Sequence, residues 1–125
     1  MKNLKSYKLF ESQDVIKNNI QDMLVDLTDS GIEVKINHGS GNKGVYIFLI
    51  SFGEVNSNQE INIVPSEWKD ELLRILSYLE SEEFKFSSYT YKYRRSYWRT
   101  SKPGTKMSEI FNLDETQFLQ IIFTN

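Results

Sequence analysis

Side chains that commonly perform covalent or metal chemistry are scarce in this chain. It has no cysteine and a single histidine, His38, among 125 residues. The lack of cysteine excludes disulfide bonds, thiolate zinc sites and cysteine nucleophiles. Sites built from several histidines are excluded too, and a Ser-His-Asp unit would have to use His38. Because His38 lies beside a glycine-rich segment with no second metal ligand near it in the sequence, we expect a solvated loop histidine and not a catalytic base.

The acidic residues are dispersed. Acid–base catalysis by paired carboxylates needs two of them held across a cleft in different environments. Asp22, Asp26 and Asp29 instead follow one expected helix, and the acidic residues within 80–83 follow the end of another. This distribution is typical of charged helix surfaces. We therefore predict no catalytic residue, no metal site and no cofactor, and we expect a protein that is not an enzyme.

A glycine motif with the spacing G-x-G-x-x-G occupies residues 39–44. In dinucleotide-binding folds this motif follows a strand and opens a helix, whose N-terminus holds the pyrophosphate. Here a strand-like segment follows, from Val45 onward. Protein kinases also place a strand after their glycine loop, but this chain is much shorter and lacks V-A-I-K, H-R-D and D-F-G segments. We therefore predict a hairpin loop in which glycine permits positive φ, and reject nucleotide binding.

Residues 84–108 differ from the rest of the chain in composition. They hold seven basic residues and no acidic one, so the remainder carries a formal charge of −9, against −2 for the whole chain. Aromatic residues are interleaved with the basic ones from Phe84 to Trp98. Arginine, tyrosine and tryptophan are enriched at the energetic centres of protein interfaces. We predict a basic aromatic strand over residues 89–102 with these partner-binding residues: Lys92, Arg94, Arg95, Tyr97, Trp98 and Arg99.

The sequence favours a protein as the partner of this strand. The acidic remainder of the chain would repel a long polyanion beyond the strand itself. The alternative is a single-stranded nucleic acid, because aromatic faces beside cations suit stacked bases and phosphates. A third interpretation needs no partner: an edge strand whose charges prevent aggregation.

The aromatic residues of this segment change parity. Phe84 and Phe86 are even-numbered, whereas Tyr89, Tyr91 and Tyr93 are odd-numbered. A regular strand would place the two groups on opposite faces. A bulge near Ser87-Ser88 would bring them to one face and leave Thr90, Lys92 and Arg94 on the other. We predict that bulge, with Tyr89 and Tyr91 lining a helix-covered core.

Apolar periodicity predicts the elements that position these residues. Helical spacing predicts helices at Ser12–Ser30 and Ser66–Ser81, each with one apolar stripe. Strand patterns occupy the segments 32–37, 45–52, 60–64, 84–99 and 118–124, and residues 107–113 suggest one helical turn. The segment 45–52 is apolar on both faces, which is typical of a central strand covered at least partly on both sides.

The order of these elements is helix, hairpin, helix, hairpin. Because each helix has a single apolar stripe, each needs one partner layer. We therefore predict an α+β two-layer sandwich, with both helices on one face of a mainly antiparallel sheet. The length fits one domain, residues 1–125. A homodimer through a sheet edge is compatible with this architecture.

The sequence also indicates a setting. It has no membrane span and no secretory signal, which together with the lack of cysteine predicts a reducing cytoplasm. The lysine-rich start Met1–Ser12, the M-L-V-D-L segment from Met23 running into I-E-V-K-I at residues 32–36, and the absence of alanine are similar to small proteins of large tailed bacteriophages. The resemblance implies a phage accessory protein that engages a host or defence protein, and it implies no catalytic residue.

Overall fold

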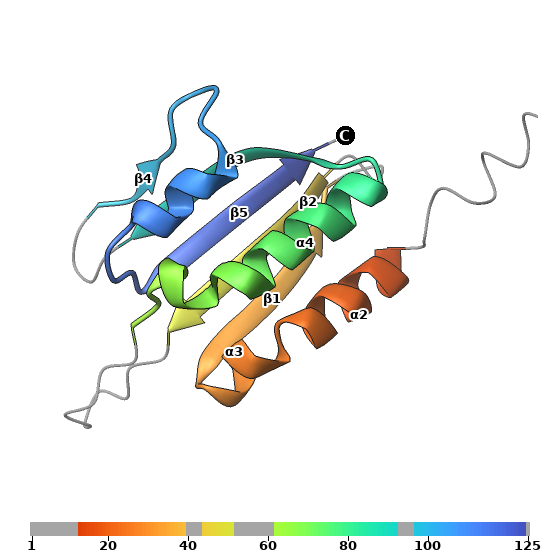
Figure 1. Ribbon diagram of the computed structural model, residues 1–125, viewed down its shortest axis with the longest axis horizontal. Helices are drawn as coiled ribbons and strands as arrows, with labels where there is room; N and C mark the ends of the chain where they lie inside the picture. Colours follow the sequence, from red (N-terminus) through yellow and green to blue (C-terminus); the bar gives the residue numbers. More distant parts are fainter. Residues whose placement is uncertain (1–12, 40–43, 52–61, 93–96, 125) are drawn as a thin grey trace, which may run out of the picture.

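The computed structural model describes residues 13–39, 44–51, 62–92 and 97–124. These residues combine helices with a five-stranded antiparallel sheet, so the α+β class is confirmed (Figure 1). In sequence order the elements are α2 Gln13–Met23, α3 Val25–Asp29, β1 Ile32–His38, β2 Gly44–Ser51, the 3-10 helix η2 Pro65–Trp68, α4 Lys69–Ser81, β3 Lys85–Lys92, β4 Arg99–Thr100, the 3-10 helix η3 Met107–Asn112 and β5 Phe118–Thr124.

The spatial order of the strands differs from their order in the sequence. The sheet runs β1-β2-β5-β3-β4, and every neighbouring pair is antiparallel. The strand that comes last in the sequence, β5, therefore lies between β2 and β3. Two hairpins, β1–β2 and β3–β4, meet on either side of it.

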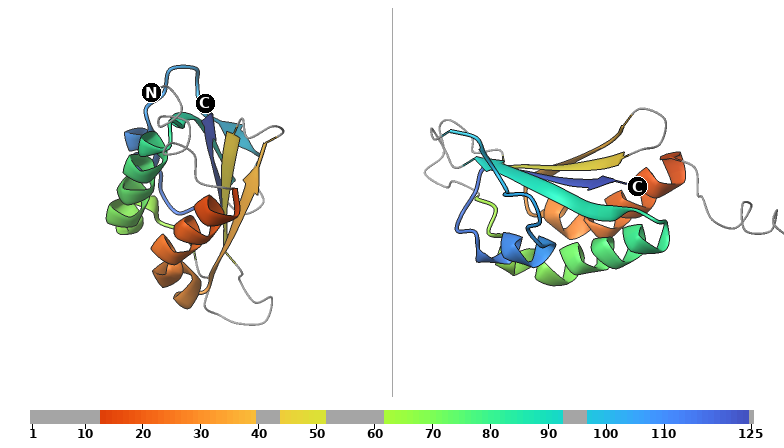
Figure 2. Two further views of the ribbon diagram at one scale, coloured as in Figure 1. Left: turned by 90° about the vertical axis from the view of Figure 1, so that its right-hand side faces the viewer. Right: turned by 90° about the horizontal axis from the view of Figure 1, so that it is seen from above.

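The helices lie together on one side of the sheet (Figure 2). Buried residues recur at helical spacing in α2 and α4, for example Ile16 and Ile20 or Leu72 and Leu79. They pack against every second residue of the central strands, because side chains alternate between the faces of a sheet. The sheet contributes these fully buried side chains to the core: Val45, Ile47, Leu49, Leu119, Ile121 and Phe123.

The helices confirm the predicted segments with two differences. The first helical segment is interrupted at Leu24, which separates α2 from α3; the Leu24 amide still donates to the carbonyls of Ile20 and Gln21. Gly31 ends this segment with φ of 93°, as a glycine stop does. The second segment opens with the 3-10 turn η2 at Pro65 before α4 begins. Ser12, the first residue of the predicted helix, lies outside the described residues.

The strands confirm most predictions and correct others. Strand β5 has the predicted bounds, and β1 and β2 match within a residue. The predicted strand 60–64 is wrong in its described part, where only an isolated bridge joins Ile63 to Thr116. The segment 84–99 is divided between β3 and β4. The helical turn predicted within residues 107–113 is the 3-10 helix η3.

The predicted bulge in β3 is confirmed. Phe86 pairs with Phe123 and Ser88 with Ile122, so Ser87 is an extra residue without a partner on β5. Because of this extra residue, the even-numbered Phe86 and the odd-numbered Tyr89 and Tyr91 lie on the same face of the sheet. Tyr89 is buried and stacks on Phe86, with ring centroids 6.4 Å apart, on the helix-covered side.

The glycine segment joins β1 to β2, as predicted. The amide of Gly39 donates to the carbonyl of Gly44 over 2.9 Å and closes the hairpin, while residues 40–43 lie outside the described part. Neither glycine has the positive φ that we predicted. They provide space instead, because a Cβ on Gly39 would lie 3.3 Å from the Tyr46 hydroxyl and one on Gly44 would lie 3.4 Å from the Tyr46 ring.

Candidate binding surface

The sheet has one face that is turned away from the helices. We call this face the open face, and the side chains on it form the candidate binding surface. No helix within the described ranges covers it (Figure 2). Strand alternation and the pairing register place on it residues from β1, β2, β5 and β3, in rows that cross the sheet. One row contains Glu33, Ile50, Phe118 and Lys92, and the next contains Lys35, Phe48, Gln120 and Thr90. Strand β2 was predicted to be covered at least partly on both sides: its helix side is buried, and on the open face Tyr46, Phe48 and Ile50 are half-buried.

Apolar side chains surround Gln120 in the middle of the open face. We call them the apolar strip; they are Tyr46, Phe48, Ile50, Phe118, Ile122 and Trp98. The strand residues among them are half-buried, and Trp98 is 52% exposed. Strand alternation normally places polar residues on the solvent side of a sheet covered on one face. An apolar strip at this position is therefore typical of an interaction surface.

The aromatic rings of the strip pack against each other. The rings of Trp98 and Phe118 meet edge to face with centroids 4.5 Å apart, and those of Phe118 and Phe48 meet with centroids 5.7 Å apart. The Lys92 ammonium lies 5.5 Å from the centroid of the Trp98 ring, within cation–π range. These contacts order a continuous path of side chains from β3 across β5 to β2.

Local hydrogen bonds set the position of Trp98. The short strand β4 pairs with β3 through Thr90 and Thr100, whose hydroxyls are 3.2 Å apart. Ser101 adds two bonds to Tyr89: its amide donates to the Tyr89 carbonyl over 2.8 Å, and its hydroxyl accepts from the Tyr89 amide over 3.1 Å. Trp98 precedes β4 directly, so this pairing holds its ring over Phe118.

The structure divides the predicted partner-binding residues. Lys92 and Trp98 meet on the open face, and Tyr97 beside them is 90% exposed. Arg99 pairs with Tyr91 in the register and therefore faces the helix side of the sheet. Arg94 and Arg95 lie outside the described residues. The sequence analysis missed Phe48 and Phe118, although the apolar character of segment 45–52 on both faces was a signal for the first.

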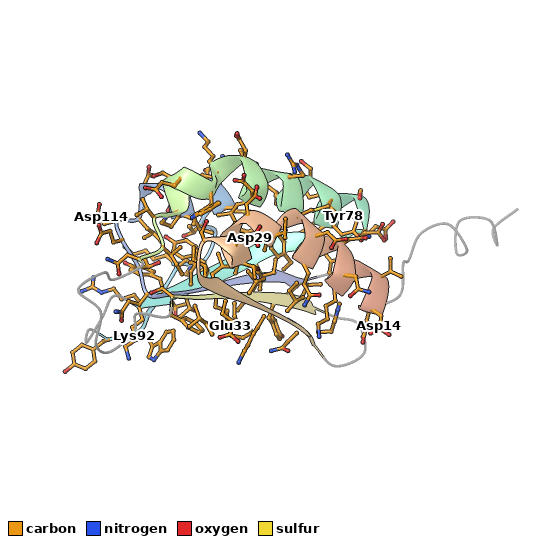
Figure 3. The ribbon with its side chains drawn as sticks, turned by 90° about the horizontal axis from the view of Figure 1, so that it is seen from below. Asp14, Asp29, Glu33, Tyr78, Lys92 and Asp114 are labelled. Atoms are coloured by element: carbon orange, nitrogen blue, oxygen red, sulfur yellow. The ribbon has the colours of Figure 1, made fainter. Side chains whose placement is uncertain are left out.

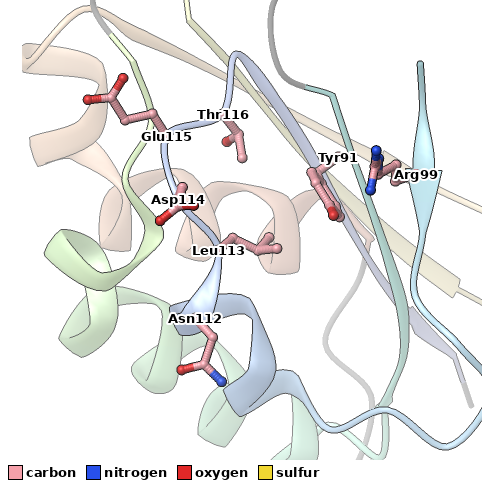
Figure 4. A pocket seen from close by; sticks show the side chains of 7 residues that line it. All are labelled: Tyr91, Arg99, Asn112, Leu113, Asp114, Glu115 and Thr116. Carbon is pink, nitrogen blue, oxygen red and sulfur yellow. The ribbon is translucent and has the colours of Figure 1, made fainter. Parts of the chain in front are cut away.

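Arg99 lines a pocket at the end of the sheet. Its volume is about 770 Å³, and Tyr91 and residues 112–116 form the rest of its wall (Figure 4). One oxygen of the Glu115 carboxylate accepts a hydrogen bond of 2.9 Å from the Asn62 side chain. An adjoining pocket of about 600 Å³ includes Tyr89, Lys102 and Glu109. Both pockets lie on the side of the sheet away from the apolar strip.

Tyr89 has a perturbed hydroxyl beside these pockets. Its pKa is raised from the ordinary value of 10.0, first because burial disfavours the phenolate and then because the carboxylate of Glu109 and the phenol of Tyr91 repel it. The phenol is therefore neutral at physiological pH. Tyr89 is buried, its ring stacks on that of Phe86 and lies tilted against that of Tyr91, and it is therefore a core residue, as predicted.

Charge is distributed unequally between the two sides of the sheet. Apart from Glu33, the acidic residues that the structure describes belong to the helices or to the turns and loops beside them. Figure 3 shows Lys92 and Glu33 on the sheet side, and Asp29 and Asp114 on the helix side. The open face carries the lysines Lys35, Lys85 and Lys92. It is therefore basic, although the whole chain has a net charge of −2.

The described residues offer no arrangement for metal chemistry. Across residues 13–39, 44–51, 62–92 and 97–124, no group of three or more His, Asp and Glu side chains is placed to hold a metal ion. His38 ends β1 and is half-buried, which corrects the prediction of a solvated loop residue; its Nε2 lies 3.0 Å from the carbonyl of Gln13. This contact links β1 to the start of α2.

No protein-family model, curated protein or solved structure matches this chain. No helix in the part that the structure describes is long and apolar enough to cross a membrane.

Proposed function

We propose that this protein is a non-enzymatic binding module that engages another protein through the open face of its sheet. The observation that carries the proposal is the ordered contact of Lys92, Trp98, Phe118 and Phe48 on that face. Ordered aromatic residues bind at low entropic cost because few rotatable bonds have to be fixed on association. In this proposal the domain is a two-layer sandwich, in which the helix layer stabilises the fold and the open face of the sheet layer binds the partner.

Ring geometry supports a protein partner over a single-stranded nucleic acid. Base stacking needs a free ring face, whereas the Phe118 and Trp98 rings contact each other edge to face and the Lys92 ammonium lies 5.5 Å from the centroid of the Trp98 ring. Arg99, which would have neutralised a phosphate beside Trp98, faces the other side of the sheet. The lysines of the open face favour the nucleic-acid alternative, and the experiment below therefore separates the two.

The proposed setting follows from the resemblance to small proteins of large tailed bacteriophages. There the module would be a phage accessory protein that acts in the bacterial cytoplasm on a host or defence protein. The surface needs only side-chain contacts for this activity and no cofactor.

Photo-crosslinking from the open face tests this function. A photoreactive phenylalanine analogue replaces Gln120 at the centre of that face, and in a control it replaces Asn18, which is exposed on α2. The full chain is irradiated in bacterial lysate with and without nuclease. We expect protein adducts from position 120 that survive nuclease, are absent from position 18 and fall at least tenfold with Trp98→Ala.

Two outcomes would reject the proposal. Adducts from position 120 that disappear after nuclease treatment would identify a nucleic acid as the ligand. Equal adducts from positions 120 and 18 would show that the open face is not a binding surface.

A further inference from the structure

The open face has a chemical pattern that specifies more than a generic partner. Its apolar strip lies on the two central strands, β2 and β5, with Trp98 at one end. Lysines flank the strip on both sides, with Lys35 on β1 and Lys85 and Lys92 on β3. Only Glu33 carries a negative charge on this face in the described part of the chain. The surface is therefore apolar along its centre and basic along its borders.

The lysines remain available to a partner. Lys35 has an ion pair with Glu33 at 3.5 Å, but its side chain is 58% exposed, and exposed pairs of this kind contribute little stability. The Lys92 ammonium lies 5.5 Å from the centroid of the Trp98 ring and has no ion pair within the described part of the chain. A cation over an aromatic face keeps hydrogen-bond donors for a carboxylate, because the ammonium has three of them.

The dimensions of the face match a helix. Adjacent strands are about 4.8 Å apart, so three spacings separate β1 from β3 by about 14 Å. An α-helix with its side chains is about 10–12 Å wide and fits between the two lysine borders. Strand β2 has 8 residues. At about 3.3 Å per residue that length corresponds to roughly 26 Å, or a helix of about 17 residues at 1.5 Å per residue.

We propose that the open face binds an acidic amphipathic helix of a partner protein. The apolar stripe of that helix lies on the apolar strip, and its acidic residues on either side of the stripe face Lys35 and Lys92. This inference rests on the proposed function, because it assumes that the open face is the binding surface. Charge complementarity selects the acidic helix over a basic or neutral one.

Occupants from this chain itself fit the face less well. A second copy would need a free apolar helical stripe, but the stripes of α2 and α4 are buried under the sheet. The exposed large apolar residues on its described helices are Val15 and Val25 alone. The N-terminal residues 1–12 contain three lysines and one glutamate, so they have the same sign of charge as the face.

Selection from a library of random 16-residue peptides tests this inference. The immobilised full chain selects peptides in parallel with Trp98→Ala, with the double variant Lys35→Glu/Lys92→Glu, and with the control Lys17→Glu/Arg74→Glu. The control makes the same change in net charge at exposed positions on α2 and α4. Near-UV circular dichroism shows whether each variant keeps the fold, and Lys92→Arg tests the cation without charge reversal.

We expect the wild-type chain to enrich acidic peptides with apolar residues at helical spacing. Recovery of these peptides falls at least tenfold on Trp98→Ala. On the double variant it falls roughly tenfold, since each exposed charge pair is equivalent to about 1.5- to 5-fold in affinity and reversal removes two of them. It changes less than twofold on the control, it falls less on Lys92→Arg than on the charge reversal, and it decreases with added salt.

Other results would overturn the inference in distinguishable ways. Enriched peptides that depend on Trp98 but are neutral, basic or alternating with period two would leave the proposed function standing and reject the acidic helix. Peptides insensitive to Trp98, or no enrichment, would reject the proposed function as well. Self-association of the wild-type chain in sedimentation that Lys35→Glu/Lys92→Glu abolishes would make a second copy the occupant.

Discussion

Deleting Ser87 should leave the fold intact, whereas deleting Thr90, three residues further along the same strand, should not. Ser87 is the unpaired residue of the β3 bulge. Without it, Phe86 still pairs with Phe123 and Ser88 with Ile122, and the faces of all later residues are unchanged. Its side chain is exposed, so little packing is lost. We expect a change in the free energy of unfolding below about 1 kcal/mol, as for surface changes away from special features.

Deletion of Thr90 makes Tyr89 and Tyr91 adjacent, so one of them must move to the open face. A buried aromatic side chain removes about 150–250 Å² from water, which corresponds to about 4–6 kcal/mol at 25 cal/mol per Å². Tyr89 is 7% exposed and would lose most of that amount. Tyr91 is half-buried, so its transfer is the cheaper solution and costs about 2–3 kcal/mol.

Urea unfolding of the two deletion variants and the wild-type chain measures this difference. A destabilisation of about 2–3 kcal/mol is a large part of the roughly 5–15 kcal/mol that stabilises a typical domain, so deletion of Thr90 should lower the unfolding midpoint clearly. Equal losses of 2 kcal/mol or more in both variants would refute the assignment of Ser87 as the extra residue. They would also refute the faces that follow from it.

Three further predictions concern the two faces and the buried phenol. Trp98→Ala should reduce the free energy of unfolding by only about 0.5–1.5 kcal/mol, the range for one aromatic pair, in addition to the contribution of the buried area that is lost. Protein capture should fall at least tenfold. A loss of unfolding free energy equal to the loss of binding free energy would contradict this prediction. Ile121→Ala should cost about 2–5 kcal/mol in urea unfolding, because Ile121 is fully buried, and Ile122→Ala on the open face less than half as much. Because the raised pKa of Tyr89 keeps its phenol protonated in the folded chain, its contribution is fully present below the ordinary value of 10.0 and is lost as pH rises beyond it. As pH rises from about 9 to 11, the free energy of unfolding should therefore decrease less for Tyr89→Phe than for the wild-type chain, as measured by urea unfolding at each pH.

Local patterns in the sequence were sufficient for the elements and for one irregularity. The apolar stripes located the helices, and the change of parity between Phe86 and Tyr89 located the bulge, because both signals depend only on residues close together in the chain. The order of strands was not predictable in this way. No local signal places β5 between β2 and β3, since that position depends on pairing between residues far apart in the sequence.

The candidate site was predictable only in part for the same reason. Lys92 and Trp98 were expected from composition, but their neighbour Phe118 comes from another part of the chain through the register of β3 with β5. Arg99 was grouped with Trp98 in the predicted binding strand, and nothing in the composition separates the two. It follows Trp98 directly, and the two residues contact opposite sides of the sheet because β4 pairs with β3 through Thr100 and Arg99.

The central place of β5 has a consequence for the order in which this protein is completed. Residues 118–124 follow β1 to β4 in the sequence, so the inner edges of β2 and β3 have no β5 to pair with until these residues have been synthesised. Such edges are templates for pairing with other chains, and nascent molecules are therefore exposed to strand exchange at this stage. The same geometry makes the gap a receptor for one strand. A β5 supplied by a second molecule could join the two hairpins as well as the chain's own, which makes this sheet a suitable frame for strand complementation in trans.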